Sequence, residues 1–454
     1  MSRRYFVLRE PVHGDVYLSK DEGRLLDTRE MQRLRGISQL GLAHLVFPGA
    51  RHSRFEHSIG TLHMTSRLVA AVNRNAELWG GELLTVSAEE ERLLRAAALV
   101  HDVTHIPFGH NIEDQTGLLP RHDSPERFRD RLSTDRELGR ALSAQGLLEG
   151  VLDILGAGGG EPGAPFLSQM ISDTICSDLM DYLRRDAWYT GLDLRYDDRI
   201  ADYFQIEAAT GRLFVDCEKQ GLLREDIVSE ILRMLQARYY FSERVYYHHA
   251  KIAAGAMVSR AVETAMLEGW IRPDELYDMT DEGLLLALRA CAEGLCGEAA
   301  VATVGLLDRL RARRLFKRVS VFPYADNREV QDELLERFFS PKATEGRRAW
   351  EREREEEFLQ RFGRRETVLL YCPSRKMQLK EVGTLVRFPG EDGLHPLARF
   401  RDQLPRIADL EESYLRLWKV YALTSATAPE ERAFLQERIR ASLPEAHDAY
   451  RITS

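Results

Sequence analysis

The 454-residue sequence lacks the usual features of membrane and secreted proteins. It contains no run of about 18 apolar residues, so no transmembrane helix is expected. The N-terminal stretch MSRRYFVLREPVHG has no apolar segment of the kind found in a signal peptide. The five cysteines, at positions 176, 217, 291, 296 and 372, form no CxxC pair, which argues against a disulfide framework and against a cysteine zinc site. These absences predict a cytoplasmic protein with reduced thiols and no membrane partner.

Two common signals for nucleotide or nucleic-acid binding are also missing. The glycine-rich stretch GAGGGEPGAP at 156–165 lacks the GK[ST] ending of a phosphate-binding loop, so we interpret it as a surface loop. The net charge of −9 argues against a general nucleic-acid-binding protein. Any polyanionic ligand would need positive charge concentrated locally, and nucleic acid as a ligand of one site stays an open alternative.

Periodicity predicts a mostly α-helical fold with a large core and an accessory region. A short hairpin is expected over residues 5–20, with Pro11 and Gly14 as turn residues. The helical period begins at Asp27. Further helices are expected over 57–76, 87–101, 124–146, 165–187, 223–238, 242–268, 273–296, 301–314 and 349–362. The stretches VSVFPY, TVLLYCP and GTLVRF predict strands after residue 318, so the C-terminal region should be a smaller mixed α/β unit.

The adjacent pair His101 and Asp102, in AAALVHDVTHIPFGH, is the most informative feature that is present. The two side chains can converge on one ion beyond a helix end, and imidazole with carboxylate makes a mixed ligand set for a divalent cation. For a His-Asp pair that stands alone, an ordinary helix cap is the alternative interpretation. Eight of the 13 histidines, however, lie between His44 and His122. His57 upstream and one downstream aspartate would complete a set of two nitrogens and two oxygens; the candidates are Asp173, Asp178, Asp181 and Asp186.

This ordered His…His-Asp…Asp pattern is that of HD-domain phosphohydrolases. The stretch DTREMQRLRGISQLGLAHLVFPGARHSRFEHSIGT resembles the deoxynucleoside triphosphate (dNTP) triphosphohydrolases of that superfamily, and the likeness extends from about residue 7 to 319. It implies an HD-domain core over residues 1–320 and an accessory or oligomerisation region over 321–454. It also implies a metal bound by His57, His101, Asp102 and Asp178, while the residues alone leave Asp173 as an alternative to Asp178.

The resemblance also implies roles for the histidines that follow the metal motif. His105 and His110 should donate to phosphate oxygens, and His122 in RHDSPERF should protonate the leaving oxygen. Glu113 is a candidate for the carboxylate that orients His122. The alternatives are histidines satisfied within their loop and, for Glu113, an exposed helix residue.

A second set of residues should hold the nucleotide, by the same resemblance. Arg54 is expected on the phosphates because a guanidinium matches phosphate oxygens in a bidentate manner. The sugar, base and remaining phosphate contacts are assigned to Gln39, Leu40, Tyr182, Asp186, Arg238, Tyr246 and His248. Packing of the aromatic run RYYFSERVYYHH in the core is the alternative, and Asp181 is expected in a cap or surface role.

The sequence departs from the vertebrate relatives at two positions. Leu179 replaces a lysine after the fourth metal ligand, so one phosphate contact must come from Arg184, Arg185 or Arg238. Ser242 replaces a histidine. Both changes affect the expected grip on the substrate.

The resemblance further implies a regulatory nucleotide site. Asp27, Gln32 and Arg35 match positions that recognise an activating GTP or dNTP at a subunit interface, whereas Phe6 replaces a basic residue nearby. Helix capping and surface charge are the alternative for all three. If the site exists, the protein should be a homo-oligomer, from dimer to tetramer or higher.

The predicted reaction is metal-dependent hydrolysis of a dNTP to deoxynucleoside and inorganic triphosphate. Mg, Mn, Fe, Co, Ni and Zn are all compatible with the ligand set. The two alternatives are an HD-type phosphodiesterase or nuclease acting on single-stranded nucleic acid or a cyclic nucleotide, and a non-catalytic nucleotide sensor. The complete ligand set argues against the sensor.

Overall fold

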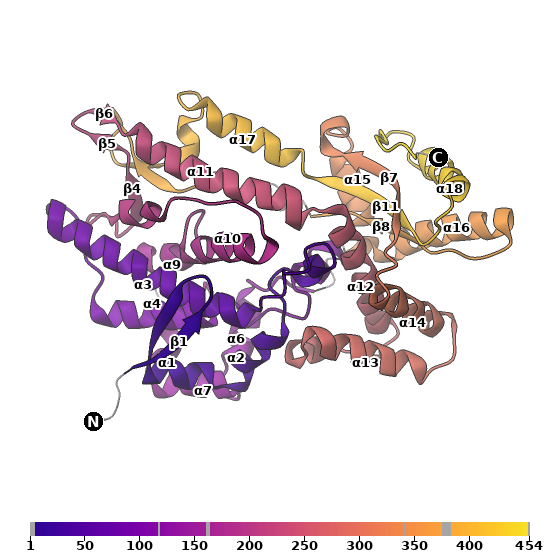
Figure 1. Ribbon diagram of the computed structural model, residues 1–454, viewed down its shortest axis with the longest axis horizontal. Helices are drawn as coiled ribbons and strands as arrows, with labels where there is room; N and C mark the ends of the chain where they lie inside the picture. The colour runs from indigo at the N-terminus through magenta and orange to yellow at the C-terminus, as the bar shows by residue number, and fades with distance from the viewer. Residues whose placement is uncertain (1–4, 117–118, 160–163, 340, 375–382, 453–454) are drawn as a thin grey trace.

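Helices dominate the computed structural model, which describes residues 5–116, 119–159, 164–339, 341–374 and 383–452 (Figure 1). The fold class predicted from the sequence is confirmed: a helical core carries an N-terminal hairpin, and small sheets lie in the C-terminal part. Part of the glycine-rich loop, 160–163, lies outside the described residues. Among the described residues, no helix combines the length and the apolar composition that crossing a membrane would need.

The chain begins with the predicted hairpin. Strands β1 (Tyr5–Glu10) and β2 (Gly14–Ser19) pair antiparallel, with Gly14 at φ +81° where the turn ends. A helix follows earlier than the periodicity predicted: α1 (Lys20–Leu26) starts at a capping box in which Ser19 and Glu22 exchange side-chain and backbone hydrogen bonds. α2 (Arg29–Arg33) comes next, where the sequence placed the first helix.

Three helices form the frame of the site. α3 (Arg54–Trp79) packs against both α4 (Ala88–Val100) and α10 (Ser177–Thr190). Gly60 on α3 permits the approach of α10, because a Cβ there would lie 1.9 Å from Asp181 Oδ1. The close packing of α3 against α10 therefore requires a glycine at position 60.

Shorter helices cover this frame, and the two helices predicted in this part of the chain are interrupted, as is the predicted helix 273–296, which is a 3₁₀ turn followed by α13 (Asp281–Glu293). The predicted helix 124–146 is two helices, because Ser133, Thr134 and Asp135 offer side-chain bonds that compete with the helical backbone. The predicted helix 165–187 breaks at residues 172–176, where Ser172 leaves helical geometry. The short helices are α5 (His110–Thr116), α6 (Pro125–Arg131), α7 (Glu137–Ala144), α8 (Leu148–Ile154) and α9 (Pro165–Ile171).

A second group of helices faces the frame. α11 (Glu225–Phe241) continues into a π-helical turn, Ser242–Tyr246, and then α12 (His249–Leu267). Such turns are often found at functional sites. α13 (Asp281–Glu293) and α14 (Glu298–Arg311) pack against α12. The 3₁₀ turns are Leu34–Gly36, Gly41–Leu45, Asp198–Tyr203, Pro273–Asp278, Tyr324–Asp326, Pro341–Ala343 and Leu397–Phe400.

The strands form small sheets. Two of the predicted C-terminal strands, VSVFPY and TVLLYCP, belong to a sheet of order β7-β11-β8, built from Lys317–Pro323, Lys419–Thr424 and Val368–Tyr371. The third predicted strand, GTLVRF, belongs to a different sheet. That sheet has the order β10-β9-β4-β3, from Leu394–Pro396, Leu385–Arg387, Leu213–Asp216 and Phe204–Ile206. Its β4 and β9 pair in parallel, and β5 (Glu218–Lys219) and β6 (Leu222–Leu223) form a separate ribbon.

Three apolar clusters make up the interior. The first fills the α3–α4–α10 frame and also takes in residues 386–417, including α17 (Pro405–Leu415), which runs along α11 in Figure 1. The second joins α12–α14 to one face of the β7-β11-β8 sheet, and the third lies between its other face and α15 (Gln331–Phe338), α16 (Thr344–Phe362) and α18 (Pro429–Ser442). The predicted domain boundary at residue 320 stays a prediction. Strand β9 and helix α17, although they follow residue 320, pack on the first cluster.

Candidate metal centre and active-site cavity

The four predicted ligands lie together at the meeting point of three helices. His57 comes from the second turn of α3, His101 and Asp102 from the end of α4, and Asp178 from the first turn of α10. His57 Nε2 is 3.2 Å from His101 Nε2, 2.9 Å from Asp178 Oδ1 and 3.8 Å from Asp102 Oδ2. Asp173, the alternative ligand, instead accepts the backbone N–H of Thr174. The structure thus gathers the set that contains Asp178.

Hydrogen bonds fix which nitrogen of each histidine faces the others. His101 Nδ1 lies 2.8 Å from the carbonyl oxygen of Ala98, and His57 Nδ1 lies 2.7 Å from Asp181 Oδ2. A carbonyl oxygen and an ionised carboxylate can only accept, so both Nδ1 atoms carry the proton. Both Nε2 atoms then face the centre, where each presents a lone pair to a metal ion once it has given up its proton.

Asp181 supports this centre from behind, contrary to the cap or surface role expected for it. Its side chain is fully buried and also accepts bonds from His13 Nε2 at 2.6 Å and from Arg185 Nε and Nη2, each at 2.9 Å. Arg185 is in turn bonded to Glu10. The expectation was wrong because hairpin and helix meet here in space. The i,i+3 spacing of Asp178 and Asp181 was the available signal.

The electrostatics of the centre suit a divalent cation. Burial lowers the pKa of His57, but hydrogen bonds to Asp178 and Asp181 outweigh burial and raise it to about 10. Burial also opposes ionisation of Asp102, yet Arg54 Nη1, 2.7 Å from Asp102 Oδ2, holds the pKa of Asp102 well below its usual range. The negative potential and the mixed N/O donor set therefore fit a hard or borderline divalent metal ion.

Three further histidines face the centre. His105 Nε2 is 3.2 Å from Asp102 Oδ1, and the His105 ring stacks on His122 at 3.9 Å between centroids. His110 meets His122 edge to face at 4.9 Å. A left-handed turn at Phe108 (φ +59°) and Gly109 (φ +43°) brings His110 there. The stacked His105 and His122 rings keep their lone pairs in nearly parallel planes, which disfavours chelation of one ion between them.

His122 is held at its Nδ1 by a buried carboxylate. Glu113 Oε2 lies 3.1 Å from His122 Nδ1, and Arg127 bonds the other oxygen of Glu113. Thr104 Oγ1 donates to the carbonyl of His122 at 2.7 Å. Burial lowers the pKa of His122, although Glu113 acts against this. This arrangement leaves Nε2 as the reactive atom of His122.

Three of the four predicted ligands, His57, Asp102 and Asp178, open with the three further histidines onto one cavity of about 330 Å³, whereas His101, Glu113 and Asp181 lie behind its lining. At the side formed by the π-helical turn, Tyr246 donates to Asp186 Oδ2 at 2.6 Å, and His52 Nε2 lies 2.8 Å from Asp186 Oδ1. Gln39 Oε1 is buried without a partner among the described residues, which leaves an acceptor for a ligand. The predicted residues that line the cavity are Gln39, Leu40, Arg54, His57, Asp102, His105, His110, His122, Asp178, Tyr182, Asp186, Arg238 and Tyr246.

Some residues at or behind the cavity wall were not found from the sequence. His52, which bonds the cavity residue Asp186 from behind, stands two positions before Arg54 in the same motif, so it could have been found. Tyr371 and Ser374 come from the C-terminal region, and nothing in their local sequence connects them to the cavity.

Other predicted residues lie elsewhere. His248 caps α12 by accepting the N–H of Ala250 and is not among the described residues that line the cavity. Leu179 is buried in the first apolar cluster. Of the three arginines proposed to replace a phosphate contact, Arg238 lines the cavity, whereas Arg184 pairs with Asp198 and Arg185 with Asp181.

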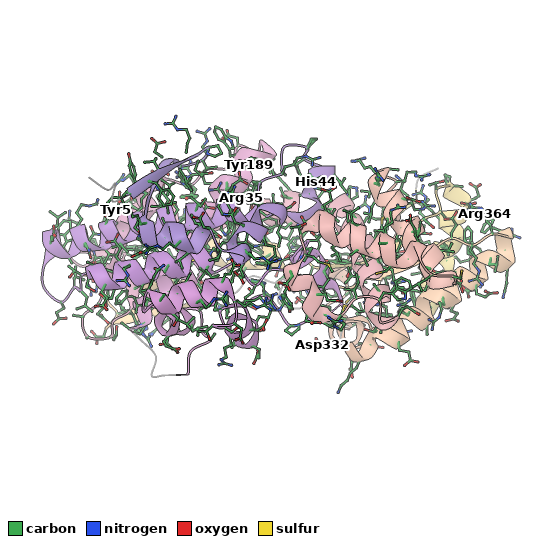
Figure 2. All side chains as sticks on the ribbon, turned by 90° about the horizontal axis from the view of Figure 1, so that it is seen from below. Tyr5, Arg35, His44, Tyr189, Asp332 and Arg364 are labelled. Atoms are coloured by element: carbon green, nitrogen blue, oxygen red, sulfur yellow. The ribbon has the colours of Figure 1, made fainter. Side chains whose placement is uncertain are left out.

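The predicted regulatory residues lie at the surface. Asp27 is exposed at the end of α1, Gln32 donates to the carbonyl of Leu26, and Arg35 donates to Gln32 Oε1 while covering the ring of Phe55 at 3.7 Å. Arg35 points to the same side of the molecule as Tyr5 of the hairpin (Figure 2). Their role in nucleotide binding stays a prediction.

Comparisons with known proteins fit this geometry. Residues 54–157 match the HD domain, and residues 215–430 match the HD associated region. The uncharacterized protein MJ1154 of Methanocaldococcus jannaschii is 27% identical over 431 residues, covering 94% of this chain and 80% of that protein. The crystal structure of a hypothetical protein from Aquifex aeolicus superposes with a TM-score of 0.64 at 23% identity, covering 97% of this chain and 100% of that one, and supports the fold.

Two other relatives match part of the chain. The uncharacterized protein YwfO of Bacillus subtilis is 31% identical over 262 residues, covering 57% of this chain and 55% of that protein. The deoxynucleoside triphosphate triphosphohydrolase SAMHD1 of Homo sapiens is 26% identical over 307 residues, covering 61% of this chain and 46% of that protein. The chain thus spans about half the length of these two relatives. Its residues match an HD domain followed by an HD associated region, the arrangement of HD-domain phosphohydrolases, and a His/Asp cluster within the HD domain could hold a divalent metal ion.

Proposed function

We propose that this chain hydrolyses dNTPs to deoxynucleosides and inorganic triphosphate. One observation carries the proposal: three of the four metal-ligand candidates, a histidine held by a carboxylate, and a tyrosine bonded to an aspartate all face one cavity. The partial likeness to SAMHD1 supports the choice of a dNTP as substrate. The preferred dNTP and the metal, among Mg, Mn, Fe, Co, Ni and Zn, are left to experiment.

His57, His101, Asp102 and Asp178 would hold the metal. A bound divalent cation supplies positive charge to phosphate oxygens and Lewis-acid activation of water. Arg54 is fixed by Asp102 and has a buried Nε without a partner among the described residues, so it can donate to a phosphate oxygen. These residues position the triphosphate next to the three histidines.

Proton transfer is assigned to His122. An alkoxide leaving group needs a proton, and the imidazolium form of His122 can give the one on Nε2, while the Nδ1 proton stays bonded to Glu113. His110 faces the same point and can donate to a phosphoryl oxygen as charge develops, whereas His105 can do so only after its Nε2 proton leaves Asp102. In this proposal Glu113 acts through His122 as a positioning residue.

The sugar is assigned to the Tyr246–Asp186 side of the cavity. Tyr246 and Tyr182 both line this side, and the Tyr246 hydroxyl is already bonded to Asp186 Oδ2. A 2′-hydroxyl would meet this bonded pair, so ribonucleotides should be poor substrates. Gln39 and Leu40 complete that wall.

Product analysis tests the proposal. The protein is incubated with each dNTP singly and with all four, with and without GTP, in Mg²⁺ and then Mn²⁺, and products are separated by anion exchange. Deoxynucleoside with inorganic triphosphate is expected, and Asp178→Asn should abolish it. Asp173→Asn is the matched control, since Asp173 lies outside the ligand set.

The alternative is an HD-type phosphodiesterase. Intact dNTPs under every condition, with bound metal verified by elemental analysis, would overturn the proposed reaction. Cleavage of an oligonucleotide or a cyclic nucleotide in the same assays would then assign the site to that class. Activity seen only with GTP or with mixed dNTPs would support the proposed regulatory site and the homo-oligomer.

A further inference from the structure

A second cavity, also of about 330 Å³, lies behind the loop of residues 101–110 that follows α4, which we call the histidine loop. Its walls come from α2, from α7 with the end of α6, and from the 3₁₀ turn Pro273–Asp278. Figure 1 shows α2, α6 and α7 side by side, on the side of the frame away from α17. Five arginines line this cavity, which we call the arginine cavity: Arg29, Arg33, Arg131, Arg136 and Arg140.

Four carboxylates, from Glu30, Asp135, Glu137 and Asp278, share the wall with the five arginines, so the lining carries one net positive charge. Asp130, outside the wall, also pairs with Arg131 at 2.6 Å. Glu137 accepts the backbone N–H of Arg29, and Glu30 accepts that of Leu138, so these two acids join α2 to α7. Asp278 pairs with Arg131 and Arg136 at 3.2 and 3.3 Å, but its side chain is 68% exposed. Solvent therefore screens the one wall carboxylate that pairs with the arginines.

Three of the five guanidiniums have no acidic partner. Within the described part of the chain, no carboxylate lies within 4 Å of the charged groups of Arg29, Arg33 or Arg140. Arg140 donates only to the carbonyls of Thr134 and Asp135. Burial, and then the nearby Arg131, lower the pKa of Arg33 to about 10, as expected for a cation without a counterion.

The arginine cavity touches the catalytic groups along two routes. Arg33 Nη2 donates to the carbonyls of Val103 and His105 at 3.0 and 2.7 Å. On the other route, Tyr277 in the cavity wall has the guanidiniums of Arg131 and Arg127 at 4.8 Å from its ring centroid. Arg127 bonds Glu113, and Glu113 bonds His122.

We propose that the arginine cavity binds a small phosphate-bearing anion, recognised through its phosphate chain, and that this anion regulates the histidine loop. Guanidinium groups bind phosphate oxygens in bidentate pairs, and the volume fits a ligand of this size. An anion here attracts Arg33 away from the carbonyls of Val103 and His105. The loop then loses two supports, so occupancy should lower kcat and leave KM nearly unchanged; this regulatory part rests on the proposed function.

Calorimetric titration with inorganic triphosphate tests the binding part without any turnover. The full-length protein is titrated in EDTA, and hydrogen exchange then locates the site. Binding with protection of residues 29–33 and 131–140 is expected. Arg136→Glu with Arg140→Glu should weaken binding at least tenfold, whereas Arg195→Glu, at an exposed arginine of another surface, should not.

Two further probes, GTP and guanosine, test whether the phosphate chain is the part of the ligand that is recognised. GTP should bind as inorganic triphosphate does, and guanosine should not bind, because the phosphate chain is the recognised group. Absence of binding, equal binding by guanosine, or unchanged binding and protection in the double variant would each overturn the proposal. Arg29→Glu gives a second variant if the double variant unfolds.

The regulatory part has its own readout. Inorganic triphosphate should lower kcat at least threefold in the wild type and not in the double variant, whose basal rate should be normal. Binding without an effect on kcat would overturn the regulatory part alone. A protein that binds triphosphate here but hydrolyses no dNTP would instead disprove the proposed function.

Discussion

Replacement of Asp181 by asparagine, compared with Glu10→Gln, should separate metal binding from folding. Asp181 accepts four hydrogen bonds, from His13, from His57 and twice from Arg185. The asparagine side chain keeps the volume of the aspartate but turns one acceptor into an N–H₂ donor. One of the two imidazole N–H groups must then face another donor, and Arg185 keeps a single acidic partner, Glu10.

The structure gives two magnitudes for this change. Loss of the carboxylate behind a metal-binding histidine typically weakens the metal about 10- to 100-fold, or about 1.4 to 2.8 kcal/mol. Breaking a buried ion pair such as Asp181–Arg185 costs about 3 to 5 kcal/mol of folding free energy. Both losses are expected in Asp181→Asn.

Glu10→Gln is the matched control, because it takes the other carboxylate from Arg185 and does not touch His57. Metal affinity is measured by competition with a chromophoric chelator, and stability by denaturant unfolding of the metal-free protein. Both variants should lose stability, but only Asp181→Asn should lose metal affinity. Equal metal affinity in the two variants would refute the view that Asp181 fixes the state of His57.

Three further predictions concern other parts of the molecule. Gly60→Ala brings a Cβ to within 1.9 Å of Asp181 Oδ1, so chemical denaturation should show a loss of about 1 to 3 kcal/mol, and unchanged stability would contradict the packing described. Glu113→Gln removes the charge that holds His122, so steady-state kinetics should show kcat lowered by about tenfold or more with KM little changed; an unaltered kcat would exclude the positioning role. Burial raises the pKa of Glu355 from 4.5 to about 7, so its ionisation destabilises the folded state increasingly as pH rises through this range. Glu355→Gln should therefore stabilise the protein by roughly 2 to 3 kcal/mol at pH 8 and hardly at all at pH 4, and equal thermal shifts at both pH values would argue against this.

The metal centre could be predicted because its ligands sit at helix ends, where short sequence patterns are informative. His57 and Asp178 lie in the first two turns of α3 and α10, and His101 and Asp102 directly follow α4; the order of the three motifs and the resemblance predicted the set, while the residues alone left Asp173 open. The hydrogen bond from His13 to Asp181, behind these ligands, could not be predicted, because His13 belongs to a hairpin whose contact with α10 depends on tertiary packing.

The strands, too, could be predicted from the sequence only in part. Strands β7 and β8 have strong apolar patterns and were expected. Strands β3 and β4 have three and four residues, too few for periodicity, and their sheet is completed by β9 from far along the chain. His248 was assigned to the base by likeness, yet local backbone geometry makes it a helix cap.

The parallel pairing of β4 with β9 has a consequence for how the protein is made. The first apolar cluster needs side chains as late as Leu417, so it stays incomplete until most of the chain has left the ribosome. Until then the nascent chain exposes apolar surface on α11 and an unpaired edge on β4, both of which favour aggregation. Because contacts of such long range form slowly, folding of the metal centre should await synthesis of the C-terminal region.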